Sequence, residues 1–347
     1  MPAGGTGLVL RGLRKEPATI GKWHLGWDLT YKEGKAKTVD NIDFTKRVAN
    51  GPTDRGFDYF YGLTSPSGPP HLYMVNDMAE KQPNTRFEDS GGGLYRIKGG
   101  IGHSDWSADG MQPHLADKML DYLDDNKNSD KPFFLYMALT APHIPLFPSK
   151  EFKGKSRIGD YGDLVMMIDD IVGRVNRKLK EIGKYDDTIV MFAADNGCAG
   201  YINMDKINRK GHYPSYIYRG YKSHGWEGGH RIPFILSWGD RYGHVTDNSL
   251  VSLTDLYATF ADMLGYRTAD DEAEDSFSFW PILDGSGNSA RTDLIATSGA
   301  GYFTYRTPQY KLIFNAGNGS GDEYRIDGQP RCNSTTWSAI PKRKSTG

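Results

Sequence analysis

Residues 161–197 read YGDLVMMIDDIVGRVNRKLKEIGKYDDTIVMFAADNG, and they give the clearest prediction of the fold class. The first part of this stretch predicts one helix, because apolar side chains recur at helical spacing and form a single stripe: Leu164, Ile168, Ile171, Val172, Val175, Leu179 and Ile182. Gly183 then suits the C-cap of that helix. Residues 188–194 predict a buried strand, since the run is apolar and β-branched.

The same alternation of helix and buried strand continues on both sides. Residues 132–143 (PFFLYMALTAPH) predict a second buried strand, preceded by a helix over 113–125, and residues 233–238 (PFILSW) predict a third. A further helix begins at Ser252, where Asp255 three residues later completes a capping-box pattern. We therefore expect an α/β fold with a large, mostly parallel sheet flanked by helices.

Two domains are predicted along the chain. Residues 1–290 form the α/β domain, and residues 291–347 form a small antiparallel C-terminal subdomain with a polar tail, because short strand-like pieces such as YFTYRT and YKLIF replace the long elements. Residues 51–102 are dense in Gly, Pro, Ser, Asn and aromatic residues. A stretch of that length with little regular pattern is typical of functional loops.

Composition excludes several classes of protein. The chain has 347 residues, 24% of them charged, and a formal net charge of −1, which argues against a general nucleic-acid binder. Apolar runs such as 133–139 are far shorter than the roughly 20 residues of a membrane span. No signal peptide is visible at the N-terminus. Cys198 and Cys332 cannot form a disulfide framework; one bridge or two thiols both remain open, as does the compartment.

Polar residues follow the predicted strands, where ligands bind in open α/β sheets. Asp195 and Asn196 offer two hard oxygen ligands for Ca²⁺ or Mg²⁺, although Asp-Asn-Gly is also good turn chemistry. His143 lies between two prolines that stiffen its loop, and a structural histidine is the alternative. Lys22 and His24 share a face if the chain is extended there, which suits an anion and a proton transfer; a surface strand end is the alternative.

A fourth segment, KSHGWEGGHRIP, precedes the strand predicted at 233–238. Its paired glycines let the backbone pass close to a neighbouring group, and Glu227 with Arg231 is expected to lock the turn as an ion pair. Lys222 then provides a second point charge for an anion. Each of the four signals is weak alone, and their joint placement at strand ends makes them specific.

These segments resemble the sulfatase family of the alkaline-phosphatase-like superfamily. GKWHLG is similar to a family signature whose active-site Lys and His fall on Lys22 and His24. TAPHIPLFPS resembles the segment with a further active-site histidine, here His143, and AADNG carries the calcium-binding Asp195 and Asn196. KSHGWEGGHRIP resembles the block whose lysine contacts the substrate sulfate, here Lys222. The resemblance runs from about residue 17 to 315, with the motifs in family order.

The sequence departs from the family at the nucleophile. Sulfatases use a Cys in C-x-P-x-R, or a Ser in a related motif, which is converted to formylglycine, and neither Cys198 nor Cys332 lies in such a pattern. The family's N-terminal pair of aspartates, which completes its calcium site, also has no counterpart before Lys22. We therefore expect an N-terminally truncated α/β domain, with an incomplete Ca²⁺ site and uncertain activity.

The resemblance implies hydrolysis of sulfate esters. Lys22 and Lys222 would offset the charge of the sulfate, His143 would protonate the leaving oxygen, and His24 would take the later proton. The expected substrate is a sulfated carbohydrate or an aryl sulfate, with a related phosphoesterase and a non-catalytic sulfated-glycan binder as alternatives. Periplasmic or secreted localisation is expected for an intact family member, and it stays unknown for this chain.

Several aromatic residues are candidates for stacking on sugar rings. They are Trp226, Trp106, His71, Tyr73 and the aromatic run 57–61. The alternative is that most of them belong to the hydrophobic core, and the sequence does not choose between the two.

Overall fold

The computed structural model describes residues 16–65, 68–315, 317 and 319. Within these ranges the chain forms two compact units that divide after Thr188. Cys332 and the polar tail lie outside the described residues. No helix in the described part of the chain is long and apolar enough to cross a bilayer.

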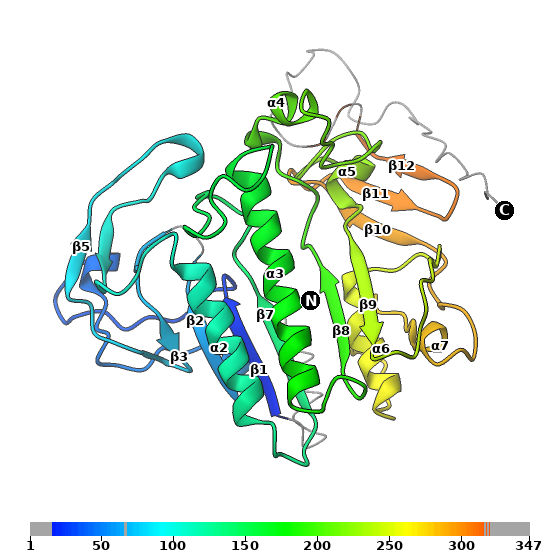
Figure 1. Ribbon diagram of the computed structural model, residues 1–347, viewed down its shortest axis with the longest axis horizontal. Coiled ribbons are helices and arrows are strands. Elements are labelled where there is room, and N and C mark those ends of the chain that lie inside the picture. The colour runs from blue at the N-terminus through cyan, green and yellow to red at the C-terminus, as the bar shows by residue number, and fades with distance from the viewer. Residues whose placement is uncertain (1–15, 66–67, 316, 318, 320–347) are drawn as a thin grey trace. The chain divides into compact units, whose positions relative to one another are not determined.

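The first unit is built on a five-stranded sheet with the order β4-β3-β2-β1-β7 (Figure 1). The strands are β1 (Glu16–Lys22), β2 (Tyr59–Leu63), β3 (Met74–Val75), β4 (Met78–Ala79) and β7 (Phe133–Ala138). β1 pairs in parallel with both β2 and β7, whereas β2–β3 and β3–β4 are antiparallel. The parallel part of the sheet thus lies at its centre and at the β7 edge.

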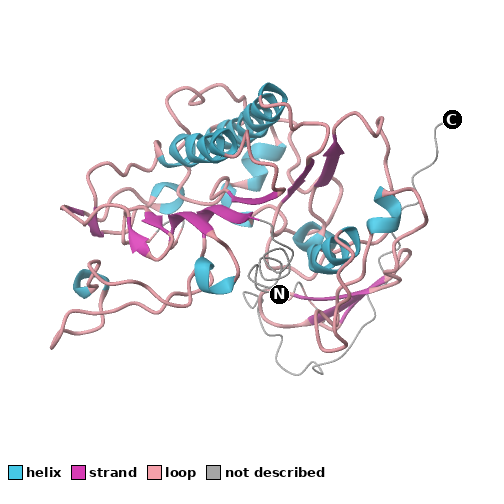
Figure 2. Cartoon of the chain, turned by 90° about the horizontal axis from the view of Figure 1, so that it is seen from below, coloured by secondary structure: helices cyan, strands magenta, loops and turns pink. Residues whose placement is uncertain are grey.

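Two helices cover this sheet. They are α2 (Met111–Asp125) and α3 (Asp160–Glu181), which pack on each other, and the strands are seen close to edge-on beneath the long helices in Figure 2. The apolar stripe of α3 is buried through Leu164, Ile168 and Ile171 among others, which confirms the predicted helix. Gly183 follows with a φ of 70°, the left-handed conformation expected of a C-cap glycine.

Residues 51–102 hold more regular structure than their composition suggested. They contain β2, β3 and β4, a separate hairpin of β5 (Thr85–Phe87) with β6 (Gly100–Gly102), and short 3₁₀ turns at Pro52–Arg55 and Gly93–Tyr95. β2 was missed because its sequence, YFYGL, has neither alternation nor β-branching. It lies next to β1, so its aromatic side chains are buried on both faces: Phe60 is 0% and Tyr61 is 1% exposed.

The second unit begins with a two-stranded antiparallel sheet of β8 (Ile189–Ala193) and β9 (Phe234–Trp238). Short helices follow the chain: α4 (Met204–Asn208), α5 (Glu227–His230), α6 (Leu256–Met263) and α7 (Trp280–Leu283). A separate antiparallel sheet is formed by β10 (Leu294–Thr297), β11 (Phe303–Arg306) and β12 (Lys311–Ile313), drawn in orange in Figure 1.

Three strands expected to be buried are only half-buried. β7 ends at Ala138, well before residue 143, and Tyr136 within it is 44% exposed. β8 has side chains of intermediate burial, and Ile235 of β9 is 61% exposed. The reason is their position, because among the described residues β7 pairs only with β1, and β8 only with β9. Apolar runs identify a strand but not how many neighbours it has.

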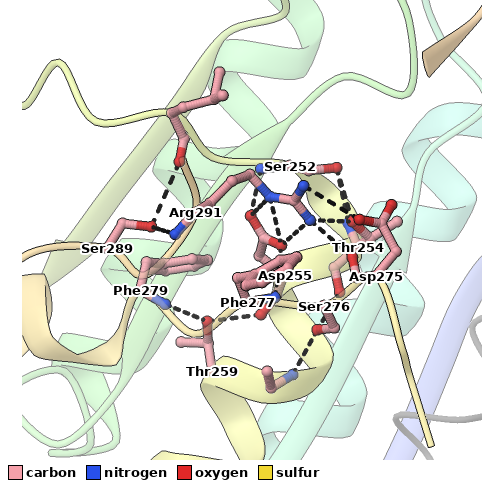
Figure 3. A network of polar contacts seen from close by, with 12 residues as sticks. Ser252, Thr254, Asp255, Thr259, Asp275, Ser276, Phe277, Phe279, Ser289 and Arg291 are labelled. Carbon is pink, nitrogen blue, oxygen red and sulfur yellow. Dashed lines mark hydrogen bonds and ion pairs between the residues drawn. The ribbon is translucent and has the colours of Figure 1, made fainter. Parts of the chain in front are cut away.

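The capping box predicted at Ser252 is present and extends into a buried ionic network (Figure 3). Asp255 caps the helix start by accepting from the Ser252 backbone, and it also binds the guanidinium of Arg291 at 2.7 Å. The side chains of Asp255 and Arg291 are 0% and 1% exposed. This network joins α6 to the chain that leads into β10.

Candidate active site

The carboxyl ends of β1 and β7 carry the candidate residues of the first unit. Lys22 is the last residue of β1 and is half-buried. Gly21 lies opposite Ala138, the last residue of β7, in the parallel register of the two strands. His143 follows in the loop that leaves β7. The sheet therefore places Lys22 and the His143 loop at the same edge.

Two glycines allow the strands to approach closely beside Lys22. A Cβ at Gly21 would lie 2.0 Å from the carbonyl oxygen of Ala138, and a Cβ at Gly62 would lie 1.7 Å from the carbonyl oxygen of Gly21. Gly21 also has a φ of 133°, which few other residues adopt. The glycine that opens GKWHLG is thus required by backbone packing, and it fixes where the following lysine leaves the sheet.

The extended geometry expected to bring His24 beside Lys22 does not continue that far. β1 ends at Lys22, and His24 has a φ of 52°, in the left-handed region. Trp23 between them is 5% exposed and packs in a core cluster, as expected of a residue on the opposite face. His24 is exposed. Its direction is set by the turn after the strand, which the alternation of a strand cannot predict.

The His143 loop is held by its own backbone. Its N–H donates to the carbonyl of Thr140 at 3.1 Å, and the X-Pro bonds on either side, Ala141–Pro142 and Ile144–Pro145, are both cis. Its ring nitrogen Nδ1 lies 2.6 Å from the carbonyl oxygen of Ile144. A carbonyl only accepts, so Nδ1 carries a hydrogen in this contact.

In the second unit, Asp195 and Asn196 form a turn directly after β8. Asp195 is exposed, Asn196 is half-buried, and the Asn196 side chain donates to the carbonyl of Gly197 at 2.9 Å. The chain bends at Asp-Asn-Gly, and the side-chain contact within the bend is local. Turn geometry and metal binding are compatible, because the carboxylate of Asp195 does not take part in that hydrogen bond.

This turn packs backbone to backbone on the segment that carries Lys222. The Gly197 N–H donates to the Gly229 carbonyl at 3.0 Å, and the Lys222 N–H donates to the Cys198 carbonyl at 2.8 Å. A Cβ at Gly197 would lie 1.8 Å from the carbonyl oxygen of Gly228. The glycine pair of EGG thus meets the Asp-Asn-Gly turn itself, and the contact ties Lys222 to Asp195 and Asn196 within one unit.

We expect Gly197→Ala to lower the free energy of unfolding by about 1–3 kcal/mol, because the added methyl must displace the Gly228 backbone. Chemical denaturation measures the loss. Gly243→Ala is the matched control, since a Cβ there meets nothing within 4 Å, and it should change stability little. Equal effects of the two substitutions would contradict the close packing.

Glu227 has more partners than the sequence suggested. The expected ion pair with Arg231 is present, but it is long, 3.6 Å, and the arginine side chain is 42% exposed. The shorter contact is to Lys311 of β12, whose Nζ lies 3.1 Å from Oε1 and whose side chain is 3% exposed. Arg306 of β11 lies 3.5 Å from the same oxygen. Glu227 therefore locks EGG chiefly onto the C-terminal sheet.

Lys311 also lies 3.0 Å from Nδ1 of His230. Burial lowers the pKa of His230, and the charge of Lys311 acts in the same direction. The pKa of Lys311 is lowered by burial as well, and Glu227 opposes that shift. The sequence did not single out Lys311 and His230. Lys311 lies more than eighty positions from Glu227, and no local pattern links the two.

The donor chemistry at Asp195 and Asn196 suits a hard cation, but the number of ligands does not. Ca²⁺ takes six to eight oxygens. Within the described ranges, no group of three or more His, Cys, Asp and Glu side chains is arranged to hold a metal ion. Asp195 and Asn196 offer two side-chain ligands, so the described residues do not complete a calcium site and we derive no reaction step through one.

The aromatic candidates for sugar stacking belong to the core instead. Trp226 and Trp106 are each 6% exposed, His71 is 2%, Tyr73 is 7%, and Phe57 is 1%. The alternative of core packing is therefore confirmed for these residues. Tryptophan and tyrosine are amphipathic, and the sequence alone cannot tell which of them face water.

The sequence and the fold are those of a known family. A profile of the sulfatase family matches residues 10–266. The chain belongs to the sulfatase family.

Curated relatives of this sulfatase chain include enzymes named for sulfated sugars. It is 28% identical to an N-acetylgalactosamine-6-O-sulfatase of Bacteroides thetaiotaomicron over 80% of its own length and 59% of that protein. It is 29% identical to an arylsulfatase of Hemicentrotus pulcherrimus (89% and 51%) and 30% identical to the human N-acetylgalactosamine-6-sulfatase (76% and 45%). The chain spans about half the length of the curated relatives it matches.

Solved structures show the same alkaline-phosphatase-like fold. A sulfatase connected with glycosaminoglycan metabolism by Bacteroides thetaiotaomicron superposes with a TM-score of 0.75 at 25% identity, covering 89% of this chain and 70% of that one. A sulfatase from Pseudoalteromonas sp. superposes with a TM-score of 0.67 at 23% identity, covering 97% and 64%. The expected fold class is confirmed.

Proposed function

We propose that this chain carries the anion-binding and proton-transfer residues of a sulfate-ester hydrolase that acts on a sulfated carbohydrate. The observation that carries the proposal is the hydrogen-bonded packing of the Lys222 segment on the Asp195–Asn196 turn. The relatives named for N-acetylgalactosamine 6-sulfate support a glycan as the substrate class. An aryl sulfate is the simpler alternative.

The resemblance to sulfatases implies a role for each residue. Lys22 and Lys222 are point charges that offset the negative charge on the sulfate oxygens, which grows in the transition state. His143 acts as the acid in its imidazolium form: it donates a ring proton to the leaving alcohol oxygen and becomes the neutral imidazole. His24 accepts the proton in the later step that expels sulfate. Asp195 and Asn196 would supply two of the six to eight oxygens that a calcium ion needs, and no step is assigned to that ion.

The nucleophile is the part that the 347 residues do not provide. They contain no C-x-P-x-R pattern, so no side chain here is assigned to the attack on sulfur. We therefore expect no release of alcohol from an aryl sulfate by the purified chain. Robust turnover, retained through purification and lost on His143→Ala, would show that another nucleophile operates and would overturn this assignment.

A binding measurement tests the proposal and requires no catalytic turnover. We expect the chain to bind N-acetylgalactosamine 6-sulfate more tightly than the unsulfated sugar, because a hydrogen bond to a charged group contributes about 1.5–3 kcal/mol. Isothermal titration calorimetry measures both affinities. Lys222→Ala should remove most of the difference, whereas Arg267→Ala, an exposed cation elsewhere in the second unit, should leave it unchanged. No preference for the sulfated sugar would exclude the proposed substrate class.

A non-catalytic sulfated-glycan binder is the second candidate, favoured by the missing C-x-P-x-R pattern. The DNA upstream of Met1 separates the two. If it encodes C-x-P-x-R and an Asp pair in frame, the longer chain should hydrolyse sulfate esters, and His143→Ala should lower kcat/KM by about 10²–10⁴-fold. If it does not, selective binding without turnover is the function.

A further inference from the structure

The geometry points to a sugar-binding subsite in the tyrosine-rich segment that leads into Lys222. A pocket of about 250 Å³ in the second unit is lined by Tyr213, Tyr216, Tyr218 and Tyr221, together with Asn208 and Ser215. The inference rests on the proposed function, because it names what holds the glycan next to its sulfate. The proposed occupant is the sugar ring adjacent to the one that bears the sulfate ester.

These tyrosines are exposed, whereas the aromatic residues predicted as sugar-stacking candidates from the sequence are buried. Tyr216 is 61% exposed, Tyr213 is 59% and Tyr221 is 38%. Tyrosine offers an apolar ring face for the C–H face of a sugar and a hydroxyl for its polar edge. Four such residues lie within nine positions and line one pocket. Aromatic side chains that stabilise the core are hidden from water, so core packing does not explain why these four lie at the surface.

The pocket is held in place by the same segment that places Lys222. The Gly228 N–H donates to the Arg219 carbonyl at 2.8 Å, and Gly220 has a φ of 86°. The ring of Tyr221 lies 4.0 Å from the ring of His224. Tyr221 directly precedes Lys222, so the pocket and the lysine belong to one short segment of the second unit.

One residue of the pocket has strained backbone. Tyr216 has a φ of 51°, in the left-handed region that an aromatic residue rarely adopts. Its N–H donates to the Tyr213 carbonyl at 2.7 Å, which closes a tight turn around the strained position. Such conformations cost of order 1–3 kcal/mol and are found mainly at ligand clamps and active sites.

Size and charge narrow the ligand. A volume of about 250 Å³ is below the roughly 300 Å³ at the lower end of drug-sized pockets, so a single ring fits better than a longer chain. Residues 204–222 are basic, with one acidic residue, Asp205, against five basic ones: Lys206, Arg209, Lys210, Arg219 and Lys222. This excess favours an anionic glycan over a neutral one.

The pocket wall also has unused hydrogen-bonding capacity. In the described part of the chain, Oδ1 of Asn208 and Oγ of Ser215 are shielded from solvent and have no hydrogen-bond partner. A shielded polar atom without a partner costs about 1–3 kcal/mol. Sugar hydroxyls are donors of the kind that would satisfy these oxygens after a small adjustment of the wall.

The test compares two probes on the full chain: N-acetylgalactosamine 6-sulfate, and a tetrasaccharide that contains it. By isothermal titration calorimetry, Tyr213→Ala and Tyr216→Ala should each weaken tetrasaccharide binding about tenfold and monosaccharide binding less than about twofold. Tyr310→Ala, which removes another exposed tyrosine of the second unit, is the control and should change neither. Thermal denaturation checks that the variants remain folded.

Each result decides between the two proposals. The subsite proposal is overturned if the wild-type chain binds the tetrasaccharide no more tightly than the monosaccharide. It is also overturned if the tyrosine variants lose the same affinity for both probes. A second result separates the proposals. If the desulfated tetrasaccharide binds through the tyrosines, and neither the sulfate group nor Lys222→Ala changes its affinity, the subsite stands and the sulfate-ester proposal is overturned. Both proposals are supported if Lys222→Ala weakens binding of the two probes while the tyrosine variants weaken binding of the tetrasaccharide alone.

Discussion

Asp255→Asn should lower the free energy of unfolding by about 3–5 kcal/mol, measured by chemical denaturation. The carboxylate of Asp255 accepts from Nε and Nη2 of Arg291 at 2.7–3.0 Å, and also from the backbone N–H groups of Ser252 and Phe277 (Figure 3). Both charged side chains are almost fully buried. The substitution leaves the guanidinium buried without its main countercharge. It also replaces one acceptor oxygen with an NH2 group, so the N–H of either Ser252 or Phe277 loses its acceptor.

Asp275→Asn is the matched control for this prediction. Asp275 contacts the same guanidinium at 3.3 Å, but its side chain is 63% exposed. An exposed ion pair contributes about 0–1 kcal/mol, since water and salt screen it. The two variants therefore remove the same chemical group from the same arginine and differ in burial. Similar losses for both would show that burial is not what makes Asp255 important.

Glu227→Gln should cost about 3 kcal/mol or more in the free energy of unfolding at neutral pH. It leaves Lys311, 3% exposed, and Arg306, 13% exposed, without their common carboxylate. Arg231→Gln should cost less than about 1 kcal/mol, because that ion pair is longer and the arginine is 42% exposed. The comparison decides whether Glu227 holds its own turn or the C-terminal sheet.

The loss in Glu227→Gln should shrink as the pH rises. Burial already lowers the pKa of Lys311, and Glu227 is the group that opposes this shift. Without Glu227 the pKa of Lys311 falls further, so the native state binds fewer protons than the unfolded state, in which lysine titrates near 10.4. By linkage, stability then increases with pH up to that value. A deficit that stays constant from neutral to alkaline pH would contradict the role of Lys311.

The elements that sequence reasoning predicted best are those with a local signal. The stripe of α3, the C-cap at Gly183 and the capping box at Ser252 each depend on residues a few positions apart, and all three are present. The sequence did not predict β2, and the prediction that β7 is fully buried was wrong. Both depend on which strands lie alongside, and sheet pairing is set by residues far apart in the chain.

The residues of the candidate site also divide into those with a local signal in the sequence and those without one. The positions of Lys22, His143, Asp195 and Lys222 near strand ends or in glycine-rich loops could be predicted, because each sits in a short motif. The extended placement of His24 was wrong, since it depended on a turn with a φ of 52°. The tyrosine pocket had a local signal, four tyrosines in residues 213–221. That they face solvent became clear only from their exposed fractions.

The family, the α/β class and the order of the motifs follow from the amino-acid sequence alone, because these are carried by residue types and short spacings. The sequence also shows that the 347 residues hold no C-x-P-x-R nucleophile pattern. The folded arrangement was needed to show which glycines are required for backbone contact, that Glu227 pairs with Lys311, and which aromatic residues face water. The physical reason is that burial and charge pairing depend on neighbours brought together by folding, which no local pattern records.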